Sequence, residues 1–313
     1  MVAGVAMFTS VTVNVGHDPS TLESDSELLG LARLIEDAKA LGCEAALKKH
    51  KHNVAYLTEP RRSRYLEVVN LRSEEHVLEI GASLGQHTRL IAKQCRSLEA
   101  LEVVPLQAQF AKMWCDESGL ENVTVTAGGA SGSLPYADGA FDVVIMNYVL
   151  EWSAGRGSES AQEFHLRLLK EIRRVLRSDG RLFLSTKNRF GLRLVLGDLD
   201  EHMGIRFGSA LPRWLSRIIL GTRSPHFPKG FLHSRRGLES LLRDAGFPAL
   251  RSYLAFPDAR FPQALVSFDR SGLRQLRELD TSALSLKSRL FRALPFFLKR
   301  NLSTSHVYVA GCR

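Results

Sequence analysis

The feature that most constrains the fold of this chain is a regular alternation of short apolar runs and longer amphipathic segments between residues 77 and 186. Apolar runs at 77–80, 98–103, 123–126, 141–146 and 181–186 predict buried strands. Segments 86–94, 106–117 and 161–176 have the apolar spacing of helices that cover a sheet. This alternation predicts an α/β fold with a mostly parallel sheet and helices on both faces. Right-handed crossovers then leave a ligand crevice at the carboxyl ends of the strands.

The segments on either side of this alternation are less regular. Helices are predicted at 25–49, 61–69 and 234–245, strands at 250–256 and 305–311, and a basic helix over 285–301 that Pro295 interrupts. Residues 1–20 have no usable pattern. We therefore expect an N-terminal helical segment over residues 1–72 and one α/β domain over 73–313. Insertions at about 189–233 and 257–303 of that domain are expected to shape the substrate site.

Composition and charge limit the kinds of partner. The chain has 44% hydrophobic and 24% charged residues, as globular proteins do, and no apolar run reaches the roughly 20 residues that span a bilayer. Its four widely spaced cysteines lack the close pairs of zinc sites, so we expect free thiols in a reducing cytoplasm and no metal. The net charge of +9 favours anionic partners, or reflects only an arginine-rich surface. Because no nucleic-acid-binding motif accompanies the charge, nucleic acid is not expected.

The loop after the first core strand is the main candidate for a ligand-binding element. It has the sequence EIGASLG over residues 79–85 and joins a predicted strand to a predicted helix. Gly81 and Gly85 would let the backbone approach a cofactor where a side chain would collide. Glu102 ends the next strand, where a carboxylate can accept both hydroxyls of an adenosine ribose. This pair fits NAD or S-adenosylmethionine equally, and a solvated charge is the alternative for Glu102.

Three segments that follow in order along the chain separate these two cofactors. Residues 134–145 have the sequence LPYADGAFDVVI, residues 147–152 NYVLEW and residues 169–180 LKEIRRVLRSDG. They resemble the LPFxDxxFDxV segment of class I S-adenosylmethionine-dependent methyltransferases, its xxVLx[H/W] continuation and the later ExxRVLxPGG segment. Ser178 and Asp179 replace the Pro and the first Gly of the last pattern. The resemblance implies a Rossmann-like, mostly parallel seven-stranded sheet and S-adenosylmethionine as the cofactor.

Two departures from the family pattern affect the cofactor site. Ser83 replaces the middle glycine of the first loop, which is tolerable if its φ is negative. The acidic residue that contacts adenine is missing from loop 127–133, so we expect the Ser131 hydroxyl or a backbone amide to replace it. The resemblance also implies an architectural Asp142 and places Asn147 beside the methionine part of the cofactor. The residues expected to bind the cofactor are Glu79, Gly81, Ser83, Gly85, Glu102, Ser131 and Asn147.

Further segments resemble one branch of this family and bear on the identity of the methyl acceptor. Segments 149–152, 187–191, 197–207 and 211–213 look like a bacterial branch of these enzymes associated with glycan, lipopolysaccharide or other cell-surface biosynthesis. This implies O-methylation of a sugar or glycan-type acceptor, which could be anionic. One alternative is a small aromatic or natural-product acceptor, methylated at oxygen, nitrogen or carbon. Another is a non-catalytic binding or scaffold protein on the same fold.

A base is needed if the acceptor is an alcohol, because its proton must leave as the oxygen attacks. His202 is the candidate, since it follows the fifth strand within an acidic cluster that includes Asp198 and Asp200. The alternative is that His202 only packs within the insertion. His226 and His233 are lesser candidates. Asp198, Asp200 and His202 have a spacing that suits metal ligands, but no further ligand accompanies them and no metal site is predicted.

Basic side chains in the insertions offer two further hypotheses. Arg189, Arg206 and Arg213 could hold a phosphate or carboxylate of the acceptor, or could simply lie in solvent. Residues 286–302 are basic and amphipathic. We expect their apolar face to pack on the sheet or close the active site, and peripheral contact with an anionic membrane is the alternative.

Overall fold

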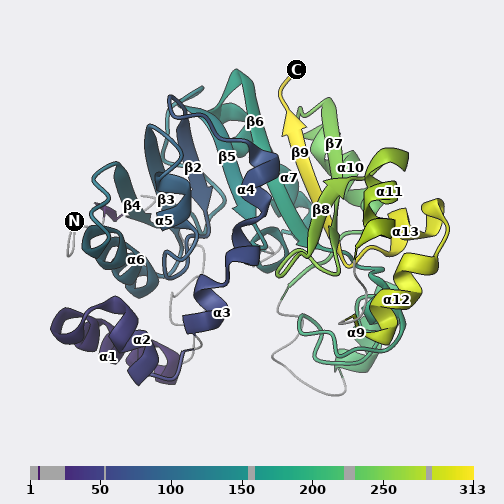
Figure 1. Ribbon diagram of the computed structural model, residues 1–313, viewed down its shortest axis with the longest axis horizontal. Coiled ribbons are helices and arrows are strands. Elements are labelled where there is room, and N and C mark those ends of the chain that lie inside the picture. Colours follow the sequence, from purple (N-terminus) through teal and green to yellow (C-terminus); the bar gives the residue numbers. More distant parts are fainter. Residues whose placement is uncertain (1–5, 8–24, 53, 154–158, 222–229, 280–283) are drawn as a thin grey trace.

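The computed structural model describes residues 6–7, 25–52, 54–153, 159–221, 230–279 and 284–313. Within this part of the chain a nine-stranded sheet forms the centre, with helices on both faces (Figure 1). Its strands are β1 (Ala6–Met7), β2 (His76–Ile80), β3 (Ser97–Glu102), β4 (Val123–Ala127), β5 (Phe141–Asn147), β6 (Leu176–Lys187), β7 (Ala249–Phe256), β8 (Ala264–Ser267) and β9 (Ser305–Gly311).

Helices and short 3₁₀ turns connect these strands. Before β5 they are α1 (Asp25–Leu41), α2 (Cys43–Lys49), α3 (Val54–Thr58), η2 (Pro60–Ser63), α4 (Tyr65–Val69), α5 (Thr88–Ala92) and α6 (Pro105–Glu117). After β5 they are η3 (Leu150–Trp152), α7 (Ala161–Val175), α8 (Leu192–Val195), α9 (Arg213–Gly221), α10 (Arg235–Asp244), α11 (Arg270–Glu278), α12 (Leu286–Ala293) and α13 (Phe296–Leu302).

The strand order explains why one end of the sheet can hold a ligand. The order is β1-β4-β3-β2-β5-β6-β9-β7-β8. Strands β1 to β6 pair in parallel, whereas β9 runs antiparallel to both β6 and β7. The chain moves outward from β2 to β4 and then returns to β5 on the other side of β2, which creates a switch point between β2 and β5. The predicted mostly parallel α/β sheet is confirmed, and the edge strands β1 and β8 extend the expected seven strands to nine.

Both faces of the sheet are buried because its strands carry apolar residues on each side. Val143 and Ile145 of β5 belong to a cluster with apolar residues of α5 and α6. Val144 and Met146 face the other way, into a cluster with α7 and α10. Helix α7 begins at a capping box in which Ser160 accepts a hydrogen bond from the Glu163 N–H. The regular alternation in the sequence therefore predicted these layers correctly.

The N-terminal helix predicted over residues 25–49 is two helices. Gly42, with a φ of +86°, separates α1 from α2. The Cys43 N–H donates to a carboxylate oxygen of Glu117 at 2.7 Å, which anchors the start of α2 to the end of α6. A left-handed glycine is a common way to end a helix, so the break has a local cause that apolar spacing did not reveal. The division of the chain at residue 72 stays a prediction.

Other differences concern the second half of the chain. Strand β6 begins at Leu176, ahead of the strand predicted at 181–186, and its pairing with β5 shifts register between Phe141 and Val143. Strand β8 and helix α11 lie in segments where no element was predicted. The predicted break at Pro295 is confirmed, because α12 ends before it and α13 begins after it.

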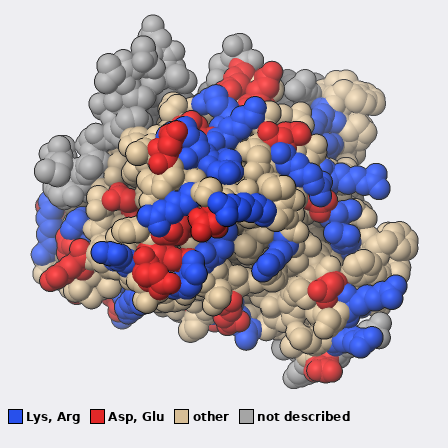
Figure 2. Space-filling view, turned by 90° about the horizontal axis from the view of Figure 1, so that it is seen from above, with Lys and Arg blue, Asp and Glu red and all other residues tan. Residues whose placement is uncertain are grey.

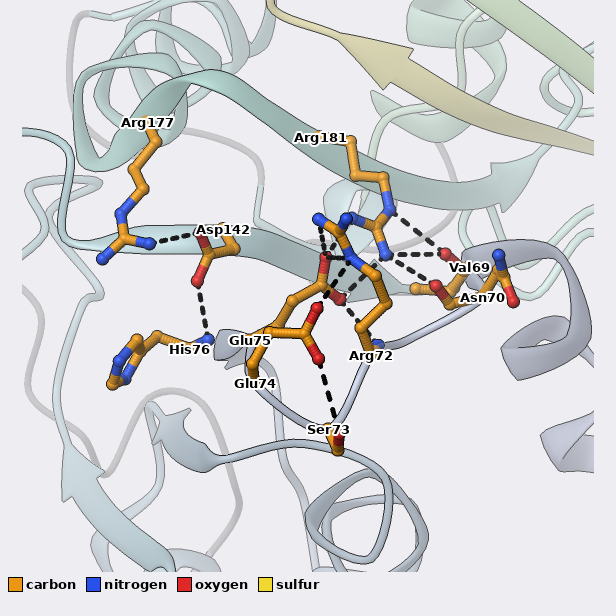
Figure 3. A network of polar contacts seen from close by, with 10 residues as sticks. All are labelled: Val69, Asn70, Arg72, Ser73, Glu74, Glu75, His76, Asp142, Arg177 and Arg181. Carbon is orange, nitrogen blue, oxygen red and sulfur yellow. Dashed lines mark hydrogen bonds and ion pairs between the residues drawn. The ribbon is translucent and has the colours of Figure 1, made fainter.

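A network of charged groups joins the amino ends of β2, β5 and β6 (Figure 3). Glu75 is buried, and both its oxygens accept from Arg181, at 2.7 and 3.0 Å. Arg181 also donates to the carbonyl oxygens of Val69 and Asn70. Asp142 accepts from the His76 N–H at 2.8 Å, which fits the architectural role that the resemblance implied. The view from above in Figure 2 shows that acidic and basic side chains are mingled on this face of the molecule.

Two findings bear on the expectations drawn from composition. All four cysteines are free and buried, and burial raises the pKa of the Cys43 and Cys115 thiols to about 12. In the described residues, no helix combines the length and the apolar character that crossing a bilayer requires.

Candidate active site

A cavity of about 620 Å³ lies at the carboxyl ends of the parallel strands. Its lining includes the last residues of β2, β3, β5 and β6 together with the loops that follow β2 to β5. The cavity therefore occupies the switch point between β2 and β5, where α/β sheets bind their ligands. Its volume lies within the usual range of small-molecule sites.

The loop after β2 winds tightly because three of its residues have positive φ: Gly81 at +83°, Ser83 at +51° and Gly85 at +86°. A Cβ on Gly81 would lie 2.3 Å from a methyl group of Val149. A Cβ on Gly85 would lie 2.9 Å from the Cα of Ala111 in α6. Gly81 and Ser83 line the cavity, whereas Gly85 is not among its lining residues and makes room for α6. The condition of a negative φ at Ser83 is not met; in its left-handed conformation the Ser83 N–H donates to Glu102.

Glu102 lies at the end of β3, lines the cavity and is buried. One oxygen accepts the Ser83 N–H at 2.7 Å and the other accepts the Val104 N–H at 3.0 Å. Two backbone amides thus fix the orientation of the carboxylate at the edge of the cavity. This geometry contradicts the alternative of a solvated charge and allows a pair of ligand hydroxyls to be bound.

Glu79 lines the same cavity from β2. The Thr88 hydroxyl donates to one of its oxygens at 2.6 Å. Burial raises the pKa of Glu79 to about 8, and the nearby negative charge of Glu102 acts in the same direction. Glu79 is therefore largely protonated at neutral pH and can donate a hydrogen bond as well as accept one.

Of the last two residues expected to bind the cofactor, Asn147 lines the cavity and Ser131 does not. Asn147 lines the cavity at the end of β5, and its side-chain oxygen accepts from the Ser185 hydroxyl at 2.5 Å. Ser131 is not among the lining residues, and its hydroxyl accepts from the Ser133 N–H within its own loop. The cavity is lined instead by Gly128, Gly129 and Ala130 of that loop, so backbone amides are better placed than Ser131 to meet a ligand.

Buried polar atoms without a hydrogen-bond partner gather around this cavity. Burying such an atom is unfavourable unless something binds it. Among the described side chains, five that line the cavity have such atoms, which include nitrogens of Arg62, Nε of Arg260, the Gln86 amide oxygen and one oxygen of Glu151. His87, which also lines it, has an unpartnered Nδ1. The cavity therefore offers donors and acceptors to a polar ligand.

One end of the cavity, which we call its polar far end, contains both acidic and basic side chains. Glu151, Lys187, Glu201 and Arg260 line it together with the ring of Trp152. Lys187 forms an ion pair with Glu201. Burial lowers the pKa of Lys187, and the positive charge of Arg260 lowers it further.

Glu151 is the functional candidate that the sequence analysis did not single out. It is completely buried, and the Thr186 hydroxyl donates to one of its oxygens at 2.6 Å. The other oxygen has no hydrogen-bond partner among the described residues. Burial raises the pKa of this carboxyl group, an effect that the hydrogen bond from Thr186 only partly offsets. Its place in the NYVLEW segment was a signal, but only the fold shows that its side chain reaches the cavity.

Two segments far apart in the sequence contact each other beside the cavity. Tyr56 of α3 and Phe261 of the loop after β7 meet edge to face, with ring centroids 5.0 Å apart. The Arg62 guanidinium lies 4.1 Å from the Tyr56 ring centroid and 5.5 Å from that of Phe261. Cation–π contacts thus join the N-terminal helices to the C-terminal half of the chain above the cavity.

His202 lies in a smaller adjoining cavity of about 150 Å³ rather than in the lining of the main one. The two cavities share Tyr148, Lys187, Glu201 and Arg260. The imidazole is buried, has no hydrogen-bond partner on either nitrogen among the described residues and lies 4.2 Å from the Trp152 ring between centroids. Burial, and then the positive charge of Lys187, lower the pKa of His202 to about 4, so the ring is neutral at neutral pH.

Of the two lesser histidine candidates, only His233 belongs to the part of the chain that the structure describes, and it does not line the cavity. His226 lies outside the described residues. His233 is buried against His165, with a nitrogen–nitrogen distance of 2.8 Å. Burial lowers the pKa of His233 to about 3, so this pair is a neutral structural element of the core.

The arginines of the first insertion bind the backbone around them. Arg189 donates to the carbonyl oxygens of Ser209 and Leu211, and Arg206 donates to that of Gly197. Arg213 lies 3.5 Å from the ring centroid of Phe231. None of the three lines the main cavity, so the expected contact with an acceptor phosphate has no support there. Among the residues that the structure describes, no cluster of three or more side chains suits a metal ion.

Comparison with known proteins places this site in a family. Residues 78–184 match the family model described as "Methyltransferase domain". The protein-L-isoaspartate O-methyltransferase of Myxococcus xanthus is 39% identical over 80 residues, which cover 25% of this chain and 37% of that protein. The Bacillus subtilis protein described as "uncharacterized methyltransferase YcgJ" is 32% identical over 126 residues, 38% of this chain and 43% of that one.

The chain therefore spans less than half the length of these relatives. The crystal structure of YcgJ from Bacillus subtilis aligns with 81% of this chain and 96% of its own, at 18% identity and a TM-score of 0.46. The matched segment runs from β2 to β6 and contains the cavity-lining residues of the first loop, Glu102 and Glu151. Residues 78–184 of this chain are thus similar to a methyltransferase domain.

Proposed function

We propose that the whole protein is an S-adenosylmethionine-dependent methyltransferase that methylates a hydroxyl group of a sugar or glycan-type acceptor. The observation that carries the first part is the buried carboxylate of Glu102, which two backbone amides orient at the edge of the cavity. A carboxylate held in this way suits the two hydroxyls of a ribose.

The lining of the cavity supports a division into two ends. The adenosyl end would be formed by the turn at Gly81 and Ser83, by Glu102 and by the backbone of Gly129 and Ala130, since the Gly128 N–H already donates to the Glu102 carbonyl oxygen. When bound, S-adenosylmethionine supplies an electrophilic methyl group on a sulfonium. Asn147 would lie beside the methionine part, between the adenosyl end and the polar far end. The reaction is an in-line displacement, so the contribution of these residues is alignment.

The far end of the cavity favours a polyhydroxylated acceptor over an aromatic one. Of the four ionisable side chains there, Glu151 and Arg260 have buried polar atoms without a hydrogen-bond partner among the described residues. Trp152 provides one apolar ring, on which a sugar ring could pack. A small aromatic acceptor would leave these charged groups buried and unbound, which is costly. The four free thiols support a reducing cytoplasm as the compartment of this reaction.

Calorimetry with S-adenosylmethionine tests the cofactor. We expect saturable binding with a dissociation constant of about 1–100 μM, as is common for enzyme ligands. NADH, as the control, should show no saturable binding. Absence of S-adenosylmethionine binding at millimolar concentration would leave the scaffold alternative as the explanation of the fold.

Two side chains compete for the role of the base that removes the acceptor proton. His202 is neutral and has unpartnered nitrogens, but its low pKa makes it a weak proton acceptor. Glu151 lines the main cavity, and its raised pKa makes it a stronger base. We therefore propose Glu151 as the better-placed base, with His202 as the alternative.

Rates of labelled methyl transfer to monosaccharides and sugar phosphates distinguish the two bases. Glu151→Gln should lower kcat about 100-fold at neutral pH, while S-adenosylmethionine affinity changes little. Because the base must be ionised, the rate of the wild-type protein should rise as the pH passes upward through the raised pKa of Glu151, and this limb should vanish in Glu151→Gln. If His202→Gln removes the limb and Glu151→Gln keeps it, His202 is the base.

A further inference from the structure

Exposed apolar side chains concentrate in the two insertions, away from the lining of the main cavity. Of the sixteen large apolar side chains that are exposed among the described residues, eleven lie within residues 190–218 and 286–297. The most exposed are Leu286 at 81%, Leu199 and Trp214 at 65%, Phe297 at 64% and Ile218 at 60%. We call this region, formed by α8, α9, α12, α13 and residues 196–199, the insertion surface. Concentrated apolar exposure of this kind marks an interaction site.

Helices α9 and α12 of the insertion surface each have one face against the protein and one exposed face with apolar side chains. In α12, Phe291 is buried and packs on Phe256 with ring centroids 6.1 Å apart. Leu286 and Leu290, one helical turn apart, are both exposed. In α9, Trp214 and Ile218 repeat this spacing on the outside. Each helix is therefore held by the protein on one side and offers an apolar ridge on the other.

The parts of the insertion surface are tied to one another. Asp198 accepts from Arg193 of α8 at 2.8 Å and forms an ion pair with Lys287 of α12. Arg189 holds the segment before α9 through the carbonyl oxygens of Ser209 and Leu211. Figure 1 shows α9, α12 and α13 grouped at the lower right of the molecule. The exposed ridges thus belong to one built region of the fold.

The charge of the insertion surface indicates the kind of partner. Residues 284–302 contain five basic residues and no acidic one. Arg289 is exposed between the two outward leucines of α12. An isologous dimer through this surface would bring like charges together, because both copies present the same patch. In α12 and α13, apolar side chains interspersed with arginine and lysine match the boundary between anionic lipid headgroups and acyl chains, and the one acidic residue of the insertion surface, Asp198, is neutralised by Arg193 and Lys287.

The insertion surface also borders a route to the active site. The 150 Å³ cavity that holds His202 is lined on one side by Leu194 and by Leu199, one of the most exposed residues of the surface. On the other side it shares Lys187, Glu201 and Arg260 with the main cavity. A molecule anchored in a bilayer beneath the insertion surface would therefore be close to the polar far end of the site.

We propose that the insertion surface docks this protein on an anionic lipid bilayer. The apolar side chains of α9, α12 and α13 enter the boundary between headgroups and acyl chains, and the basic side chains of residues 284–302 meet the lipid phosphates. This inference goes beyond the proposed function, because docking requires neither cofactor nor acceptor.

Co-sedimentation with vesicles tests the docking surface in the full-length protein. Vesicles of phosphatidylcholine with about one third phosphatidylglycerol should bind the protein at least about tenfold more strongly than vesicles of phosphatidylcholine alone. Trp214→Asp combined with Leu286→Asp should lower the partition coefficient at least about tenfold, because two apolar side chains no longer enter the lipid. The matched control is Leu29→Asp, since Leu29 of α1 is 59% exposed and lies outside the insertion surface.

Three outcomes would overturn the proposal: no binding to anionic vesicles, equal binding of the double variant and the wild type, or loss of binding in Leu29→Asp alone. Light scattering in solution tests whether a second copy of this chain, instead of a bilayer, covers the insertion surface. A dimer that the double variant dissociates, together with absent vesicle binding, would assign the surface to self-association and refute lipid docking. Far-UV circular dichroism and calorimetry with S-adenosylmethionine should be unchanged in all three proteins, so failure of docking is distinguishable from failure of the proposed function.

Discussion

Replacing Glu102 with alanine is expected to lower the affinity for S-adenosylmethionine about 1,000-fold. Hydrogen bonds to a charged group contribute about 1.5–3 kcal/mol each, so losing two ribose contacts removes about 3–6 kcal/mol. The same substitution leaves the N–H groups of Ser83 and Val104 without their acceptor, which loosens the turn after β2. Both effects act on the adenosyl end of the cavity. Calorimetry with the purified variants measures the change.

Two further variants make this prediction specific. Glu102→Gln keeps one carbonyl acceptor and the size of the side chain, so its affinity should fall only about 10- to 100-fold. Glu99→Gln, on the same strand but outside the cavity lining, should bind as the wild type does. An affinity of Glu102→Ala within threefold of the wild type would show that the carboxylate does not hold the cofactor.

Replacing Arg181 with alanine is expected to lower the free energy of unfolding by about 3 kcal/mol. Glu75 is only 1% exposed, and Arg181 satisfies both its oxygens while also binding two backbone carbonyls (Figure 3). Without Arg181, the buried carboxylate would depend on Arg72, whose side chain is 64% exposed. Breaking a buried ion pair from one side costs far more than losing an exposed one. Urea unfolding followed by circular dichroism measures the difference.

The control for Arg181→Ala is a variant that removes a neighbouring ion pair of the same network. Arg177→Ala removes a partner of Asp142, but Arg177 is 46% exposed, so the loss should stay below about 1 kcal/mol. The effect of Arg181→Ala should also shrink in acid. Although burial raises the pKa of Glu75, its bonds to Arg181 and Arg72 outweigh this and leave the pKa lowered in the folded protein. The stabilisation is therefore present at neutral pH and disappears as the pH falls through that lowered value. Equal losses in the two variants would contradict this account of the network.

The sequence predicted the layers of this fold because the signal for them is local. Apolar runs and helical periodicity lie within single segments, and β2 to β5 and α6 and α7 therefore appear close to the predicted positions. Elements stabilised by partners distant in the sequence were missed. Strand β8 exists because it pairs with β7, and α1 ends where Glu117, far along the chain, anchors Cys43.

The candidate site was predictable in part for the same reason. Glu79, Gly81, Ser83, Glu102 and Asn147 all line the cavity, since strand ends and turns fix their positions. The sign of φ at Ser83 could not be inferred, because it depends on the hydrogen bond to Glu102.

The far end of the site was less visible in the sequence. Arg62 and Arg260 both line the cavity because the segment with α3 and η2 packs on the loop after β7. Glu151 acquires its raised pKa from burial, which a sequence motif does not express.

The most direct test of the central claim is a crystal structure with S-adenosylhomocysteine. We predict that the adenosyl group lies against the turn at Gly81 and Ser83, with both ribose hydroxyls within about 3 Å of the Glu102 carboxylate oxygens. The homocysteine sulfur should then point toward the end of the cavity where Glu151 and Trp152 lie. A ligand bound elsewhere, or a ribose that makes no contact with Glu102, would contradict the account.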